Sequence, residues 1–194
     1  AKPVALQPQP QAPKPALAEQ FAFNQVIGEM EVAMNVMHKD KQFFIPQSLV
    51  IDARGLSPVR QKRLLIAYLA NWSVSQGIIT YPYQLGSLVF GKFRSSVVKQ
   101  AFSETDLNDG IQQGIQEKAL VQEIIDELAP ADLTRSSSIF RYSSADYVPT
   151  AALVDALEAI GSRIGRGAPI YQKVNEALAA RRPPAPAGGA GGAL

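Results

Sequence analysis

Residues 57–75 of the chain read SPVRQKRLLIAYLANWSVS, and this stretch predicts the most clearly bounded helix in the sequence. Ser57 followed by Pro58 is a typical helix start, with the serine as N-cap and the proline in the first turn. Apolar side chains then recur at three- and four-residue steps, which places them on one side of the helix. They are Leu64, Leu65, Tyr68, Leu69 and Trp72. We therefore expect a core helix from Pro58 to Ser75.

Similar patterns predict further helices on both sides of this stretch, so the chain is expected to be mainly helical. The expected ranges are 17–38, 97–102, 106–128, 150–160 and 169–180. Gly110 and Gly114 lie four residues apart within one of them, a spacing of small residues that permits another helix to approach closely. Runs rich in β-branched and aromatic residues predict short strands around 43–52, 78–90 and 138–143. The predicted fold class is therefore α+β, mainly α-helical, with the topology left open.

Composition divides the 194 residues into one folded segment and two arms. Residues 1–16 are mostly Pro, Ala, Gln and Lys, and residues 181–194 are mostly Arg, Pro, Ala and Gly. Neither arm has enough apolar side chain to offset the entropy of ordering it, so both are expected to be disordered. We expect a single folded domain from residue 17 to residue 180.

The chain contains no cysteine and a single histidine, His38. These counts exclude disulfides, cysteine-ligated zinc or iron–sulfur clusters and any multi-histidine metal site, so no cofactor or metal is expected. Apolar runs stay far below the roughly 18 residues that span a bilayer, so no transmembrane segment is expected in this chain. The compartment stays open between cytoplasmic and, if a removed signal or anchor preceded Ala1, exported or periplasmic.

Charge is segregated along the chain, although the formal net charge is only +2. Residues 53–103 hold seven Lys or Arg and no acidic residue, whereas residues 104–132 hold eight acidic residues and one lysine. Three interpretations fit this pattern. The blocks can neutralise each other inside the fold, or the basic block can bind phosphate or an acidic partner. Alternatively, the basic face of one subunit can meet the acidic face of the next subunit.

A surface for nucleic acid or an acidic protein would use the basic block together with the glycine-rich basic stretch GSRIGRG at 161–167. The residues predicted to form it are Arg54, Arg60, Lys62, Arg63, Lys92, Arg94, Lys99, Arg163 and Arg166, with help from Arg181 and Arg182. Aromatic residues interleave the block, which suits stacking on single strands. Residues 82–102 can also be drawn as helix, turn and helix, with Gly91 in the turn. Aromatic core residues between surface cations explain the same pattern equally well.

No residue pattern predicts a catalytic centre. Ser96 and Lys99 match S-x-x-K, but the S-D-N and K-T-G motifs that accompany it in penicillin-binding proteins and β-lactamases are absent. A capping serine and a surface lysine account for the match. His38 is expected to be solvated at a helix end, where the helix dipole favours it. We therefore expect the chain not to be an enzyme.

These observations predict a non-enzymatic interaction or assembly module, a subunit of a larger complex that is tethered by its arms. The expected partners are other protein subunits, with a second copy of the chain among them. The alternative is a nucleic-acid-binding protein that uses the basic, aromatic-interleaved block 54–102.

Overall fold

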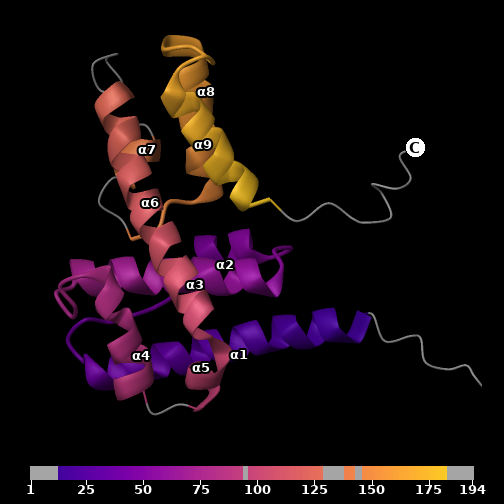
Figure 1. Ribbon diagram of the computed structural model, residues 1–194, viewed down its shortest axis with the longest axis vertical. Coiled ribbons are helices and arrows are strands. Elements are labelled where there is room, and N and C mark those ends of the chain that lie inside the picture. Colours follow the sequence, from indigo (N-terminus) through magenta and orange to yellow (C-terminus); the bar gives the residue numbers. More distant parts are fainter. Residues whose placement is uncertain (1–12, 94–95, 129–137, 143–145, 183–194) are drawn as a thin grey trace, which may run out of the picture.

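The computed structural model describes residues 13–93, 96–128, 138–142 and 146–182, and it consists of helices joined by turns and short extended segments (Figure 1). The elements in chain order are α1 (Pro13–Met37), α2 (Gln47–Ala53), α3 (Pro58–Ser75), the 3-10 helix η3 (Pro82–Gln84), α4 (Leu85–Lys92), α5 (Ser96–Ala101), α6 (Glu104–Leu128), α7 (Ser138–Arg141), α8 (Thr150–Arg163) and α9 (Pro169–Ala180). Helix α1 begins before the expected domain start at residue 17. Most of the two expected arms, residues 1–12 and 183–194, lies outside the described residues.

The prediction of an α+β fold is wrong, because the described part of the chain contains helices and no strand. Residues 43–46 belong to neither a helix nor a strand, and the backbone groups of Phe43 and Ile45 bond to side chains of α1. The Asn35 side chain donates to the Phe43 carbonyl and accepts from the Phe43 N–H, both at 2.7 Å. Glu31 accepts from the Ile45 N–H at 2.8 Å. These two side chains satisfy backbone groups that a neighbouring strand would satisfy in a sheet.

The other stretches predicted as strands contain helices, and in two of these helices the buried apolar residues are spaced for a helix. In α2, which occupies most of the run 43–52, the buried residues Leu49 and Ala53 are four apart. In α4, within the run 78–90, Leu85, Leu88 and Val89 are buried at three- and four-residue steps. The run 138–143 contains the short helix α7. Packing of these faces overrides the β preference of their individual residues, which is weak and context-dependent.

Helix α3 is the central helix of the larger apolar core. Its bounds are those predicted, and the Ser57 Oγ accepts a hydrogen bond from the Arg60 N–H at 3.3 Å as the N-cap. Every residue from Leu64 to Ser73 is buried, so this span is enclosed on all sides. Phe43 covers part of it, with its ring edge-on to that of Trp72 and the ring centroids 4.7 Å apart.

Helix α6 contributes to two separate apolar cores. Its first half packs Leu107 and Ile111 into the core built with α1 to α5. Its second half packs Ile124 and Leu128 into the core built with α7, α8 and α9. Figure 1 shows α6 running from α3 in the lower part of the view to α8 and α9 in the upper part. Helix α6 is therefore the element that both parts of the fold share.

Two glycines of α6 allow it to cross α3 closely, as their spacing in the sequence indicated. A Cβ added to Gly110 would lie 2.6 Å from the Cβ of Ile66, and one added to Gly114 would lie 3.1 Å from the carbonyl oxygen of Ala67. Gly110 has no room for a side chain, and a side chain at Gly114 would require its neighbours to move by a few tenths of an ångström. Asn71 of α3 is close enough to donate a hydrogen bond from its Nδ2 to the Gly114 carbonyl at 3.2 Å.

We predict that Gly110→Ala destabilises the protein by about 1–3 kcal/mol, because the new methyl group overpacks the buried Ile66. The better helix propensity of alanine, worth about 1 kcal/mol, offsets only part of this cost. Gly28→Ala in α1 is the matched control, since an added Cβ there meets nothing within 4 Å. Urea denaturation should show Gly110→Ala less stable than wild type and Gly28→Ala equal or more stable. Equal stability of the two variants would contradict the tight crossing.

Candidate functional site

The predicted cations in the first turns of α3 face the acidic start of α6. The Nζ of Lys62 lies 4.0 Å from the Oδ2 of Asp106, and the Nη2 of Arg63 lies 2.9 Å from the Oδ2 of Asp109. Both pairs are partly exposed, so each contributes little to stability. They nevertheless show that part of the basic block is neutralised by the acidic block within the fold.

Two further predicted cations lie at separate places around the same core. The Nη1 of Arg60 donates to the carbonyl oxygen of Arg182 at 2.6 Å, which brings the segment after α9 against the start of α3. Arg54 is exposed directly after α2. Arg60 is thus engaged with the backbone, whereas Arg54 faces solvent.

The segment drawn as helix, turn and helix contains the two short helices α4 and α5. Gly91 lies inside α4 and not in the turn. Helix α5 has six residues, and Lys99 is its only cation. Lys92 is exposed at the end of α4, Lys99 is half-buried, and Arg94 lies outside the described residues. A recognition helix presents several side chains to base edges from one face, and α5 has little length for this.

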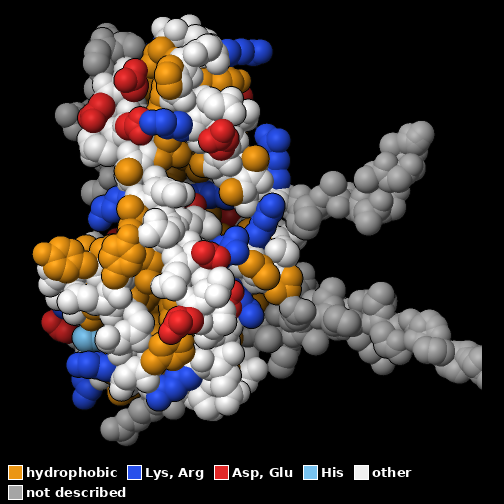
Figure 2. All heavy atoms as spheres, viewed as in Figure 1, with side chains coloured by type: hydrophobic (Ala, Val, Ile, Leu, Met, Phe, Trp, Pro, Cys, Tyr) orange, Lys and Arg blue, Asp and Glu red, His pale blue; other side chains and the backbone are white. Residues whose placement is uncertain are grey.

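The remaining predicted cations, Arg163 and Arg166, lie at the end of α8 and in the turn before α9. Figure 1 places this turn at one end of the molecule and α4 and α5 at the other. Figure 2 shows Lys and Arg side chains interspersed with Asp and Glu over the visible face. The structure therefore distributes the predicted cations among several regions.

An apolar groove of about 1010 Å³ brings Lys92 and Lys99 together with α1. Its lining residues are Glu29, Val32, Ala33, Val36, Met37, Gly91, Lys92, Phe93 and Lys99. Val32 and Val36 are 62% and 63% exposed, one turn apart on the same face of α1. Phe93 is buried at the groove. Helix α1 thus packs one face into the core and leaves a second apolar face open.

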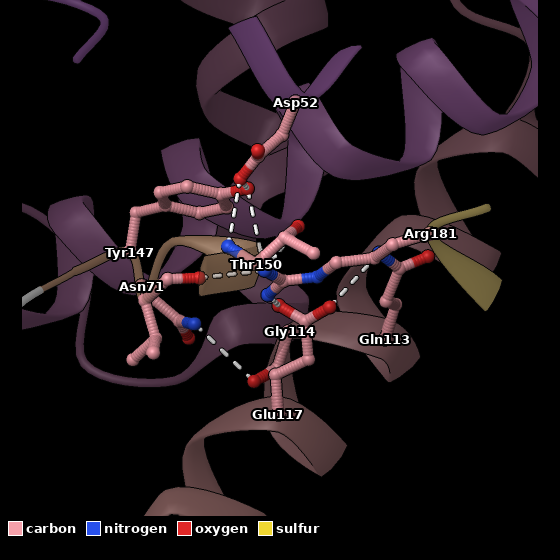
Figure 3. Close-up of polar contacts among 9 residues, drawn as sticks. Asp52, Asn71, Gln113, Gly114, Glu117, Tyr147, Thr150 and Arg181 are labelled. Carbon is pink, nitrogen blue, oxygen red and sulfur yellow. Dashed lines mark hydrogen bonds and ion pairs between the residues drawn. The ribbon is translucent and has the colours of Figure 1, made fainter. Parts of the chain in front are cut away.

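A buried polar network, centred on Arg181, joins the two parts of the fold (Figure 3). Arg181 directly follows α9 and is only 6% exposed, so it is not available as a surface cation. Its Nη1 donates to the Val148 carbonyl at 2.6 Å, and its Nη2 lies 3.4 Å from the Oε1 of Glu117 in α6. Its guanidinium also lies over the ring of Tyr147, 4.9 Å from the centroid.

Asp52 of α2 also belongs to this network and contacts it through Tyr147 and Thr150. Its Oδ2 accepts a hydrogen bond from the Tyr147 hydroxyl and another from the Thr150 N–H at 2.9 Å. Thr150 is the first residue of α8, so the carboxylate of Asp52 caps that helix as well as binding the tyrosine. As Figure 3 shows, residues of α2 and α6 meet here with the first residue of α8 and with Arg181, which follows α9.

A cavity of about 260 Å³ lies beside the network. Its lining residues are Asn71, Glu117, Lys118, Leu120, Val121, Asp146, Tyr147, Val148, Leu153, Ala177 and Arg181. The Nε of Arg181 is buried and has no hydrogen-bond partner among the described residues. Burial raises the pKa of Asp146, against the opposing effects of a hydrogen bond from Ser75 and the charge of Lys118. The cavity therefore combines apolar walls with charged side chains, one of which, Asp146, is a partly desolvated acid.

Sequence reasoning missed this network because its partners are far apart in the chain. Arg181 was expected to open a disordered arm and to help bind nucleic acid, and Asp52 was part of an expected strand. Tyr147 and Asp52 are 95 residues apart, and no local pattern links them. The available signal was an arginine directly after a predicted helix end, a position where cations often bind exposed carbonyls.

No family model, curated protein or solved structure matches this chain. Among the described residues, no three His, Asp or Glu side chains gather in a way that could hold a metal ion. None of the described helices is both long enough and apolar enough to cross a bilayer.

We predict that stability falls above pH 10 because two tyrosines are buried as hydrogen-bond donors. Burial is the main cause that raises the pKa of both Tyr68, which donates to the Phe44 carbonyl at 3.0 Å, and Tyr147. The unfolded chain releases these protons near pH 10 while the folded chain retains them. The free energy of unfolding should therefore fall by up to about 1.4 kcal/mol per pH unit for each tyrosine.

Urea denaturation at a series of alkaline pH values measures this slope. Tyr68→Phe and Tyr147→Phe should each reduce it, whatever their effect on stability at neutral pH. Tyr81→Phe is the control, because Tyr81 is 64% exposed. An identical slope in all four proteins would show that the buried hydroxyls do not control alkaline unfolding.

Proposed function

We propose that the chain is a non-enzymatic assembly module that associates with a second copy of itself through the groove between α1, α4 and α5. The observation that carries the proposal is the open apolar face of α1, where Val32 and Val36 are both more than 60% exposed. Contiguous apolar surface bordered by charged residues is typical of interaction sites.

Charge at the groove supports a second copy as the occupant. The groove carries one acidic residue, Glu29, and two basic residues, Lys92 and Lys99. In a two-fold symmetric contact, each residue that meets a partner residue is met by it in return. A surface that carries both acidic and basic residues can therefore form the same ion pair twice, once in each direction. The valines of the two copies would pack between the two ion pairs.

The exposed apolar area at the groove is small, so we expect the association to be weak. Stable interfaces usually bury about 1,200–2,000 Å² in total, and two exposed valines supply only part of such an area. A dissociation constant on the order of micromolar is expected for a contact of this size and polarity. Assembly would then depend on local concentration in the complex to which the chain belongs.

Sedimentation velocity of the full chain over a wide concentration range tests the proposal. Wild type should convert from monomer to dimer as concentration rises, and the double variant Val32→Asp, Val36→Asp should remain monomeric. Both valines are exposed, so the variant should keep the wild-type circular dichroism spectrum and melting temperature. Val154→Asp on α8, where the valine is 39% exposed, is the matched control and should dimerise like wild type.

Charge exchange separates this pairing from non-specific hydrophobic association. Glu29→Lys alone should weaken the dimer by like-charge repulsion, and the added change Lys92→Glu should restore it. A wild-type chain that stays monomeric at every concentration would overturn the proposal. Monomeric chains that bind labelled DNA with a steep loss at higher salt, abolished by Lys92→Glu, would support the nucleic-acid alternative in its place.

A further inference from the structure

Helix α1 and the turn after it carry an exposed stripe with the spacing of a coiled-coil seam. Alternating steps of four and three residues keep one face of a helix directed toward a partner helix. The stripe consists of Gln25, Glu29, Val32, Val36 and Lys39, of which Glu29 is half-buried and the others are exposed. The core-facing residues of α1 form a separate stripe, which includes Val26, Met30 and Met34. Figure 1 shows α1 at the periphery of the larger core, where a second helix has access to it.

The two ends of the stripe have opposite charges. Glu29 precedes the two valines, and Lys39 follows them. Val32 and Val36 lie two residues on either side of Met34, and Glu29 and Lys39 lie five residues on either side of it. A two-fold axis at the level of Met34, perpendicular to the helix, would therefore place each valine opposite a valine and each charge opposite its counter-charge.

We propose that α1 of the second copy occupies the groove and packs antiparallel against α1, with the two-fold axis at Met34. Val32 of one copy then meets Val36 of the other, and Glu29 meets Lys39, each contact occurring twice. This inference rests on the proposed assembly through α1 and specifies its geometry.

A parallel pair of helices would bring like charges together. In a parallel two-fold pair each residue of the seam meets its own equivalent, so Glu29 would face Glu29 and Lys39 would face Lys39. Like charges placed directly opposite each other at an interface oppose association. The order of charges along the stripe therefore favours the antiparallel pair.

The position of Lys92 agrees with the same orientation. Lys92 ends α4 and lines the groove together with Val36 and Met37 of α1. Figure 1 shows α4 beside the C-terminal part of α1. An antiparallel partner directs its Glu29 toward this part of α1, and hence toward Lys92 as well as Lys39.

Charge reversal at Lys39 tests the orientation by sedimentation velocity of the full chain. Lys39→Glu should weaken the dimer about ten-fold, because it places two carboxylates together at both contacts. Adding Glu29→Lys to this variant should restore the dimer. Arg166→Glu is the matched control, since Arg166 is exposed in the turn before α9, and it should dimerise like wild type. Unchanged dimerisation of Lys39→Glu would overturn the antiparallel pairing.

Disulfide cross-linking measures the same contact directly, because the chain has no cysteine of its own. Glu29→Cys mixed with isotope-labelled Lys39→Cys should give a mixed disulfide, which mass spectrometry distinguishes from the two symmetric products. A disulfide requires Cα atoms within roughly 4.4–6.8 Å. Neither variant should cross-link with itself, because the antiparallel pair separates its two cysteines by the rise of ten residues, about 15 Å.

The outcomes separate this pairing from the proposed assembly itself. A wild-type dimer that gives no mixed disulfide, or whose Glu29→Cys variant cross-links with itself, would overturn the antiparallel pairing and leave assembly through α1 standing. A wild-type chain that stays monomeric at every concentration would overturn both.

Discussion

The close crossing of α3 and α6 is the constraint on which the rest of the structure depends. Gly110 and Gly114 let the backbone of α6 lie against Ile66 and Ala67, so that the fully enclosed part of α3 is covered without a gap. The same approach lets Asn71 reach a carbonyl of α6. Because α6 continues beyond the crossing, it also carries Glu117 to Arg181. The position of the buried network, and of the cavity beside it, therefore follows from how tightly two helices meet.

The crossing also explains the separation of charge along the chain. The basic first turns of α3 and the acidic first turns of α6 lie side by side, and Arg63 pairs with Asp109 at 2.9 Å. The basic and acidic blocks are separate in the sequence but adjacent in space in this region. Part of the basic block therefore needs no external partner. Lys92 and Lys99 are placed differently, because α4 and α5 turn them toward the open face of α1. The two sets of cations have the same sequence signature and different surroundings.

Local signals predicted the helices well and the long-range contacts poorly. Ser57, Pro58 and the apolar repeat after them fixed the bounds of α3, and the glycine pair indicated the tight contact in α6. The strands were wrong because β preference was weighed residue by residue, whereas three- and four-residue spacing and the side chains of Asn35 and Glu31 decided the outcome. The groove was not predicted, because Val32 and Val36 lie outside the apolar repeat that indicated the helix. The network of Asp52, Tyr147 and Arg181 was not predicted either, because nothing near any of these residues in the chain indicates the others.

Helix α6 belongs to both apolar cores, so the unfolding of one core is coupled to the unfolding of the other. If α7, α8 and α9 separated from α6, the second half of that helix would lose its apolar partners, and helical segments shorter than about 12–15 residues are marginal in water. Opening of one core therefore also weakens the element that organises the other. The amide hydrogens in the middle of α6 should then exchange with solvent only through global unfolding, as one cooperative unit with those of α3. The shared helix makes it difficult for either part of the chain to fold without the other.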